Sequence, residues 1–148
     1  MPEKDTLERA KQDMREDKAP STAAGEFVHE EIEHVREGKH GARSAKQAIA
    51  IGLSKARRAG IPLKPPKSGS KTVRKRAERE YEEGQEHSGR KPSAKRSRST
   101  VDALKREPKS TTARSALSRQ AKSASAKKSA ASRSMSASRG ARRRAAAR

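Results

Sequence analysis

Apolar residues recur at helical spacing near the start of the chain. Leu7, Ala10 and Met14 stand at positions i, i+3 and i+7, among charged residues. This spacing places them on one face of a helix, and the segment ends before Pro20, which disfavours a helical conformation in the residue ahead of it. The pattern predicts a first helix over about residues 6–17.

A second stripe of apolar residues follows the proline. Val28, Ile32 and Val35 recur at i, i+4 and i+7, the Ser21-Thr22 pair can cap the start, and Gly38 can end the helix in a left-handed conformation. The stripe predicts a second helix whose apolar face is centred on these three side chains.

The third predicted helix, residues 45–59, has the clearest boundary signals. Ser44 and Gln47 form a capping-box pattern, Gly60 supplies a C-terminal stop, and Pro62 prevents continuation. Its apolar face consists mostly of small residues, which allow close helix packing. We expect this helix to pair with the second one as an antiparallel helical hairpin, joined by residues 38–43. Such a thin core is of marginal stability and leaves room for a homo-oligomer or a protein partner.

The rest of the chain shows weaker patterning. Three prolines (Pro62, Pro65 and Pro66) form a joint, and residues 71–86 fit a solvated, marginal helix. The last 57 residues contain 13 Ser, 14 Ala and 17 Lys or Arg, with few large apolar side chains. Such a composition predicts a disordered tail because it can bury little apolar surface.

The predicted fold class is therefore mostly α with extensive disorder. It comprises a small N-terminal helical hairpin module over residues 1–66, a Pro-rich hinge with a charged, helical segment over residues 67–91, and an intrinsically disordered basic tail over residues 92–148.

The positive charge is concentrated at the C-terminal end of the chain. The chain has 38 Lys and Arg against 18 Asp and Glu, a formal net charge of +20, and residues 92–148 alone carry 17 basic and 2 acidic side chains. An excess of this size is typical of proteins that bind polyanions. The chain has no cysteine, and its start has no apolar run of the kind found in signal peptides or membrane spans. These features predict a cytoplasmic, nucleoid-associated protein without membrane contact.

Phosphate contact by basic side chains is the predicted binding mode. Phe27 and Tyr81 are the only aromatic residues, so the chain lacks the stacking surfaces of single-strand and RNA readers. We expect non-enzymatic, sequence-nonspecific binding of nucleic acid, with duplex DNA favoured over RNA, in a nucleoid or histone-like role. The candidate residues are Arg43, Lys46, Arg57, Arg58, Arg74, Lys75, Arg76, Lys95, Arg96, Arg98, Lys105, Arg106, Arg119, Lys122, Lys127, Lys128, Arg133, Arg139, Arg142, Arg143, Arg144 and Arg148.

Three other interpretations stay open. Residues 45–59 would be a recognition helix if Arg43, Lys46 and Gln47 reached base edges, although the preceding turn is longer than usual. The basic tail would otherwise be only a solubilising terminus. In a different class of function, the helical pair binds a protein partner, and the tail is an anchor for DNA or for RNA and the ribosome.

Three Glu-x-x-His pairs lie between residues 26 and 40, a spacing used for metal ions in four-helix carboxylate proteins. All three fall on about one helix, whereas such sites draw ligands from facing helices. Glu26, Glu30, Glu33 and Glu37 share the face opposite the apolar stripe, which predicts a solvated acidic surface or one that masks the basic tail. No metal, cofactor or catalytic residue is expected.

Residues 25–60 resemble an uncharacterised family of small basic bacterial proteins, most specifically in the motif GKHGARSxKQAIAIGLSKARRAG of residues 38–60. Its members are labelled DNA-binding or plasmid-stabilisation-like. Looser similarity extends to the segments around Tyr81, Ala103–Glu107 and Ala116–Ser125, and the tail is similar in composition to histone-like proteins. The resemblance implies a bacterial cytoplasmic protein associated with DNA, and it implies no active site.

Overall fold

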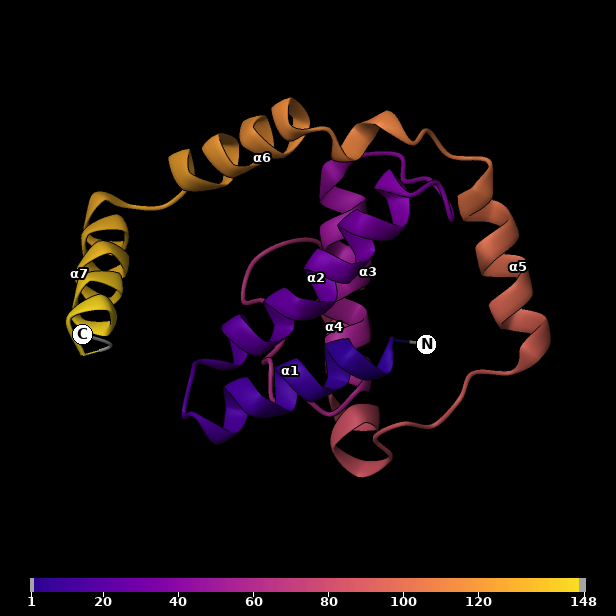
Figure 1. The fold of residues 1–148 in the computed structure, drawn as a ribbon, viewed down its shortest axis with the longest axis horizontal. Helices are drawn as coiled ribbons and strands as arrows, with labels where there is room; N and C mark the ends of the chain where they lie inside the picture. Colours follow the sequence, from indigo (N-terminus) through magenta and orange to yellow (C-terminus); the bar gives the residue numbers. More distant parts are fainter. Residues whose placement is uncertain (1, 147–148) are drawn as a thin grey trace. The chain divides into compact units, whose positions relative to one another are not determined.

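The computed structural model describes residues 2–146, and their regular structure is helical throughout (Figure 1). The elements within these residues are α1 (Lys4–Arg15), α2 (Pro20–Arg36), α3 (Ala45–Arg58), α4 (Lys71–Glu86), α5 (Ala94–Lys105), the 3₁₀ turn η1 (Ser110–Thr112), α6 (Arg114–Ala126) and α7 (Ala130–Ala146).

The prediction of a disordered C-terminal tail was wrong. Residues 92–146 contain the helices α5, α6 and α7 and the 3₁₀ turn η1, although none of the three α-helices buries a residue. Low hydrophobicity was the argument for disorder, but Ala, Arg and Lys are among the strongest helix formers and carry their preference without a core. Intrinsic propensity therefore accounts for these helices better than burial does.

The boundaries of the earlier helices follow their sequence signals closely. The third predicted helix is confirmed as α3, and the Ser44 hydroxyl caps it by accepting a hydrogen bond from the Gln47 N–H at 3.1 Å. Ser70 caps α4 in the same way. Pro20 is the exception, because it begins α2 at a position where its missing N–H costs nothing, and α2 therefore starts earlier than the Ser21-Thr22 pair.

Helices α1 to α4 pack in chain order, with α1 against α2, α2 against α3 and α3 against α4 (Figure 1). The expected helical hairpin was therefore wrong as a description of the module, because α2 and α3 are the central pair of a four-helix arrangement. Two glycines permit the close packing. A Cβ added to Gly52 would lie 2.6 Å from the Val28 Cα of α2, and one added to Gly84 would clash with the Arg57 carbonyl of α3.

Only part of the predicted apolar stripe of α2 belongs to the core: Val35 is fully buried and packs with Ala42 and Ala48. Phe27 is fully buried with Ala23 and Ala24, and Ala10, Ala56 and Ile61 complete this part of the core. Val28 and Ile32 are only half-buried. The buried face is centred on Phe27 because α2 has two neighbours, α1 and α3, and both cover that side.

The segment after α5 lies against the loop between α2 and α3. The N–H groups of Gly41 and Ala42 donate to the carbonyls of Leu104 and Pro108 at 2.8 and 2.9 Å, and the Thr111 hydroxyl donates to the Ala42 carbonyl. These bonds hold residues 104–112 on the four-helix arrangement.

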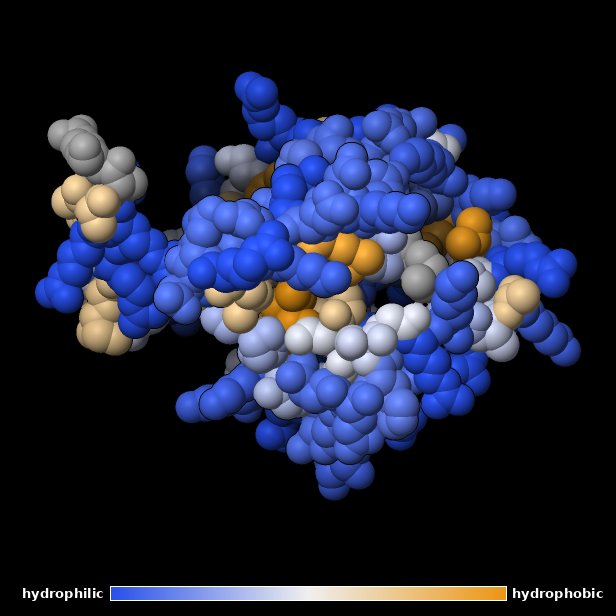
Figure 2. Space-filling view, turned by 60° about the horizontal axis from the view of Figure 1, so that its bottom comes forward, coloured by the Kyte–Doolittle hydropathy of each residue, from blue (hydrophilic) through white to orange (hydrophobic). Residues whose placement is uncertain are grey.

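The chain divides into two compact units, an N-terminal unit of residues 1–112 and a C-terminal unit of residues 113–148. This division falls after η1. Figure 2 shows a mostly hydrophilic surface with small apolar patches. Among residues 2–146, no helix is both long enough and apolar enough to cross a membrane.

Candidate functional site

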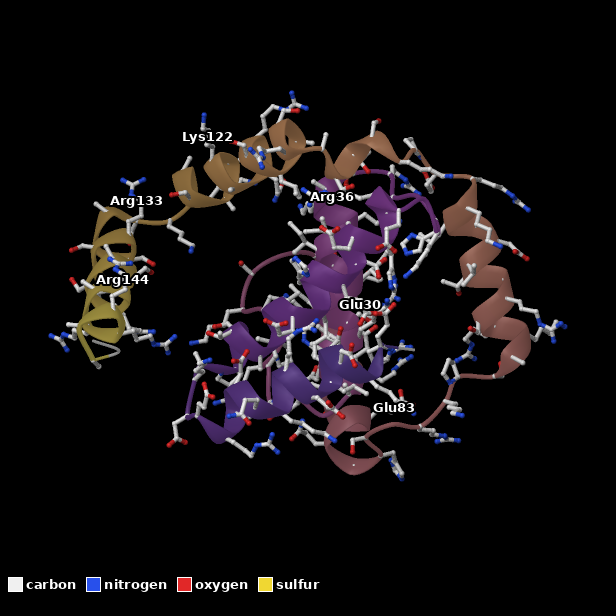
Figure 3. All side chains as sticks on the ribbon, viewed as in Figure 1. Glu30, Arg36, Glu83, Lys122, Arg133 and Arg144 are labelled. Carbon is white, nitrogen blue, oxygen red and sulfur yellow. The ribbon has the colours of Figure 1, made fainter. Side chains whose placement is uncertain are left out.

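The C-terminal unit carries only positive formal side-chain charge. Its sequence has 11 Lys and Arg and no Asp or Glu, whereas the N-terminal unit has 27 basic and 18 acidic side chains. All basic side chains of residues 113–146 are exposed. Figure 3 shows Lys122 on α6 and Arg133 on α7 extending away from their helices. The predicted residues here are Arg119, Lys122, Lys127, Lys128, Arg133, Arg139, Arg142, Arg143 and Arg144, and Arg148 lies outside the described residues.

The helix α5 carries a second group of exposed cations. Lys95, Arg96, Arg98 and Lys105 lie on it, and Arg106 follows directly at its C-terminal end. One carboxylate, Asp102, lies on the same helix. The positive charge of α5 is therefore partly offset, unlike that of α6 and α7.

Three of the seven candidate residues within residues 43–76 are engaged by acidic neighbours. Arg58 and Arg76 both pair with Glu80, at 3.3 and 3.1 Å, and Arg43 lies 3.8 Å from Glu107. Lys46, Arg74 and Lys75 are exposed.

Arg57 occupies a different environment from the other candidate cations. It is buried, its Nε donates to the Leu63 carbonyl at 3.3 Å, and desolvation lowers the pKa of its guanidinium. Its side chain holds the chain after α3 in place and is not presented to a phosphate.

The geometry of α3 does not favour a recognition helix. Ala45, Ala48, Gly52 and Ala56 are buried between α2 and α4. The Gln47 side chain accepts a hydrogen bond from the Arg43 N–H, so it is already committed to the start of the helix.

The expected solvated acidic surface of α2 is wrong for one of its four members. Glu30 is buried, and its carboxylate accepts a hydrogen bond from the Glu3 N–H at 3.0 Å, at the start of α1. Burial by itself raises the pKa of Glu30, but the Glu3 N–H, Thr6 and Lys55 together hold the pKa below its ordinary value. Lys55 Nζ lies 3.3 Å from the Glu30 carboxylate.

The other members of that surface pair within the N-terminal unit. Glu26 binds Arg9 at 2.6 Å, Glu33 binds Arg36 at 2.7 Å, and Glu37 binds Lys39 at 3.0 Å. Their charges are therefore compensated locally, without any contribution from the basic residues of α6 and α7.

Glu31, His34 and His40 form a cluster, the Glu31 cluster, which sequence reasoning did not assemble. One ligand-type atom from each lies within 4.8 Å of the others. Glu31 is fully buried, and neither carboxylate oxygen has a hydrogen-bond partner with suitable geometry. Lys55 Nζ lies 2.7 Å from its Oε2, and His40 Nε2 lies 3.3 Å from its Oε1.

The sequence contained part of the signal for this cluster. Glu31 and His34 are one of the three Glu-x-x-His pairs. The third member lies on the loop after α2, where Gly38 adopts a left-handed conformation with φ of 77°. The chain then reverses, and His40 returns to the side of α2 that carries Glu31.

A pocket of about 640 Å³ lies in the N-terminal unit beside α1, α3 and the loop after α4. Its lining includes Leu7 and Ala59 together with the cations Lys11, Lys55 and Arg58. Lys55 and Arg58 already pair with buried carboxylates, and Glu83 also lines the pocket, so its positive charge is partly compensated.

No protein-family model, no curated protein and no solved structure matches this chain.

Proposed function

We propose that this chain binds nucleic acid without enzymatic action, through contacts between phosphates and the basic side chains of α6 and α7. The observation that carries the proposal is uncompensated positive charge. Residues 113–148 contain no acidic side chain, and every described lysine and arginine among them is exposed. The sugar-phosphate backbone of nucleic acid attracts such a surface, because each basic side chain that contacts a phosphate releases condensed counterions.

The helices fix the spacing of the charges. At 1.5 Å per residue, the 13 residues of α6 and the 17 of α7 span about 20 and 25 Å. Five arginines lie on α7, and at 3.6 residues per turn they cover an arc of about 200°, which is wider than a single stripe. This distribution favours several phosphate contacts over readout of one set of base edges.

The aromatic residues support a duplex over a single strand. Phe27 is fully buried and Tyr81 is half-buried, so neither forms a stacking platform in the C-terminal unit. We propose duplex DNA as the preferred partner. We extend the proposal to a nucleoid-associated role.

The alternative of a protein-binding helical pair has less support. The facing surfaces of α2 and α3 are covered by each other and by α1 and α4. Among the described residues, the exposed large apolar side chains are Val73, Val101 and Met135, one on each of three helices. Isolated apolar side chains of this kind do not form a protein-binding patch.

The test compares two full-length variants with equal net charge. One carries glutamine at the five arginines of α7 (Arg133, Arg139, Arg142, Arg143 and Arg144). The control carries glutamine at five exposed cations of the N-terminal unit (Lys4, Lys64, Lys67, Lys71 and Arg79). Binding of a labelled duplex is measured by fluorescence anisotropy over a series of salt concentrations.

If all five arginines of α7 contact phosphates, the slope of log K against log salt becomes shallower by about 4.5 in the first variant, from about 0.9 counterion per contact. The control should keep the parental slope. Equal losses in both variants would show that net charge alone matters, and an unchanged slope in the α7 variant would refute the proposal. Competition with unrelated duplexes and with structured RNA tests nonspecificity and the preference for DNA.

A further inference from the structure

The Glu31 cluster has the chemistry of a metal site. Two imidazoles and one carboxylate are the ligand set of many zinc sites, and nitrogen-rich sites select transition metals over Mg²⁺ and Ca²⁺. Glu31 comes from the middle of α2, His34 from its last turn, and His40 from the loop after it. Glu31 is fully buried, and the side chains of His34 and His40 are only 14% and 11% exposed.

Hydrogen bonding orients His40 with a lone pair toward Glu31. Its Nδ1 lies 2.9 Å from the Gly41 carbonyl, which can only accept, so Nδ1 carries the proton. In the neutral ring, Nε2 then holds a lone pair and lies 3.3 Å from Glu31 Oε1. Two lone pairs at this distance repel each other unless a cation lies between them. Two ligands bound tetrahedrally to zinc, with bonds of about 2.0–2.1 Å, are separated by roughly 3.3–3.4 Å.

The neighbouring groups match those that orient metal ligands. His34 Nε2 lies 3.0 Å from the Glu3 carboxylate, and this contact leaves Nδ1 as the ring nitrogen with a lone pair. Lys55 Nζ lies 2.7 Å from Glu31 Oε2, so Oε1 is the oxygen left for a cation. Each of the three side chains therefore has one polar atom held by a neighbour and one polar atom free to coordinate.

We propose that Glu31, His34 and His40 bind one divalent transition-metal ion, with Zn²⁺ as the best fit to the ligand set and a water molecule in the fourth position. The ion ties the last turns of α2 to the loop that receives residues 104–112, through the backbone bonds of Gly41 and Ala42. Its role is structural, and the proposal does not depend on nucleic-acid binding.

The first experiment measures Zn²⁺ binding to the full-length chain by calorimetry, with Co²⁺ absorption as a spectroscopic probe. We expect one ion per chain and the visible bands of tetrahedral Co²⁺. Changes beyond the ligands themselves cost roughly 10- to 100-fold in metal affinity, so His40→Ala, His34→Ala and Glu31→Gln should each weaken binding by at least about 100-fold. The matched controls are His29→Ala and His87→Ala, because these two exposed histidines complete the chain's four.

A second measurement on the unaltered protein covers the case in which a variant fails to fold. Long-range ¹H–¹⁵N spectra report the protonation of each imidazole nitrogen. Zinc should shift His40 Nε2 and His34 Nδ1 and leave both rings of His29 and His87 unchanged. The proposal is overturned if His40 is protonated on both nitrogens and zinc leaves it so, or if the control variants weaken binding as much as the cluster variants.

Discussion

Glycine at position 52 determines how closely α3 can approach α2. A Cβ at this position would lie 2.6 Å from Val28 Cα and 2.9 Å from Val28 N, and backbone atoms cannot move aside as a side-chain end can. We expect Gly52→Ala to lower the free energy of unfolding by roughly 1–3 kcal/mol, the usual cost of overpacking, in spite of alanine's better helix propensity.

Gly25→Ala is the matched control for this prediction. Gly25 lies inside α2, and nothing comes within 4 Å of an added Cβ. Alanine there should raise the free energy of unfolding by up to about 1 kcal/mol. Urea unfolding measures the free energy of unfolding of both variants. If both values change in the same direction, the close packing of α2 and α3 is contradicted.

Lys55 compensates the charge of the buried Glu31 carboxylate, so replacing Lys55 should destabilise the fold. Lys55→Met leaves Glu31 fully buried and without its cation. Breaking a buried pair on one side costs roughly 3–5 kcal/mol, and we expect the lower end because the Lys55 side chain is 22% exposed. Lys46→Met, at an exposed position of the same helix, should change stability little. Urea unfolding in the presence of a chelator compares them, and similar midpoints would contradict this role for Lys55.

At the scale of single side chains, the sequence identified capping residues better than buried charges. Ser44 was predictable because a cap depends only on its neighbours in the chain. The burial of Glu30 and Glu31 depends on which side of α2 is covered by α1 and α3, and on where Lys55 of α3 comes to lie. The stripe of Val28, Ile32 and Val35 predicted the buried face only in part, because Val35 is fully buried but Phe27, which lies outside the stripe, is at the centre of the larger core cluster.

Among the elements, equivalent caps have unequal consequences. Ser44 and Ser93 each accept a hydrogen bond from the N–H three residues later, at the start of α3 and α5. Loss of such a cap typically costs about 1 kcal/mol of helix stability. Because α3 is central to the core and α5 buries no residue, Ser44→Ala should lower the global free energy of unfolding, and Ser93→Ala should not.

Thermal unfolding monitored by Tyr81 fluorescence reports on the four-helix arrangement, since Tyr81 lies on α4. A lower midpoint for Ser44→Ala with an unchanged midpoint for Ser93→Ala is the expected result. Equal shifts would mean that α5 unfolds together with α1 to α4.

The sequence also shows why the helices after residue 92 escaped prediction. Hydrophobic periodicity indicates helices that pack against a core, and α5, α6 and α7 have no buried residues. Their signal is propensity alone, from alanine, lysine and arginine. The packing of α4 through Gly84 was equally hidden, because a glycine inside a charged helix gives no indication of a backbone approach.

At the scale of the whole molecule, the two units are expected to differ in their resistance to proteolysis. The C-terminal unit has exposed lysines and arginines and no buried side chain in its helices, whereas the N-terminal unit contains the core. Helices without tertiary packing open easily, so limited trypsin digestion should remove residues after about 113 first. Mass spectrometry should find a resistant fragment that retains α1 to α4.

Duplex DNA provides the control for this digestion. If α6 and α7 contact phosphates, saturating DNA should slow cleavage within residues 114–146 and leave cleavage of the N-terminal unit unchanged. Early cuts in α1 to α4 would contradict the assignment of the core to that unit.

The absence of buried side chains in α6 and α7 also bears on how the two parts of the chain can change over evolutionary time. Substitution there is limited by charge and by the capacity to form a helix, and arginine can replace lysine, or alanine serine, at little cost. In α2 and α3, the backbone approach at Gly52 and the buried polar groups around Glu31 constrain individual positions. We expect the C-terminal unit to diverge quickly in sequence while keeping its composition, and the N-terminal unit to drift slowly.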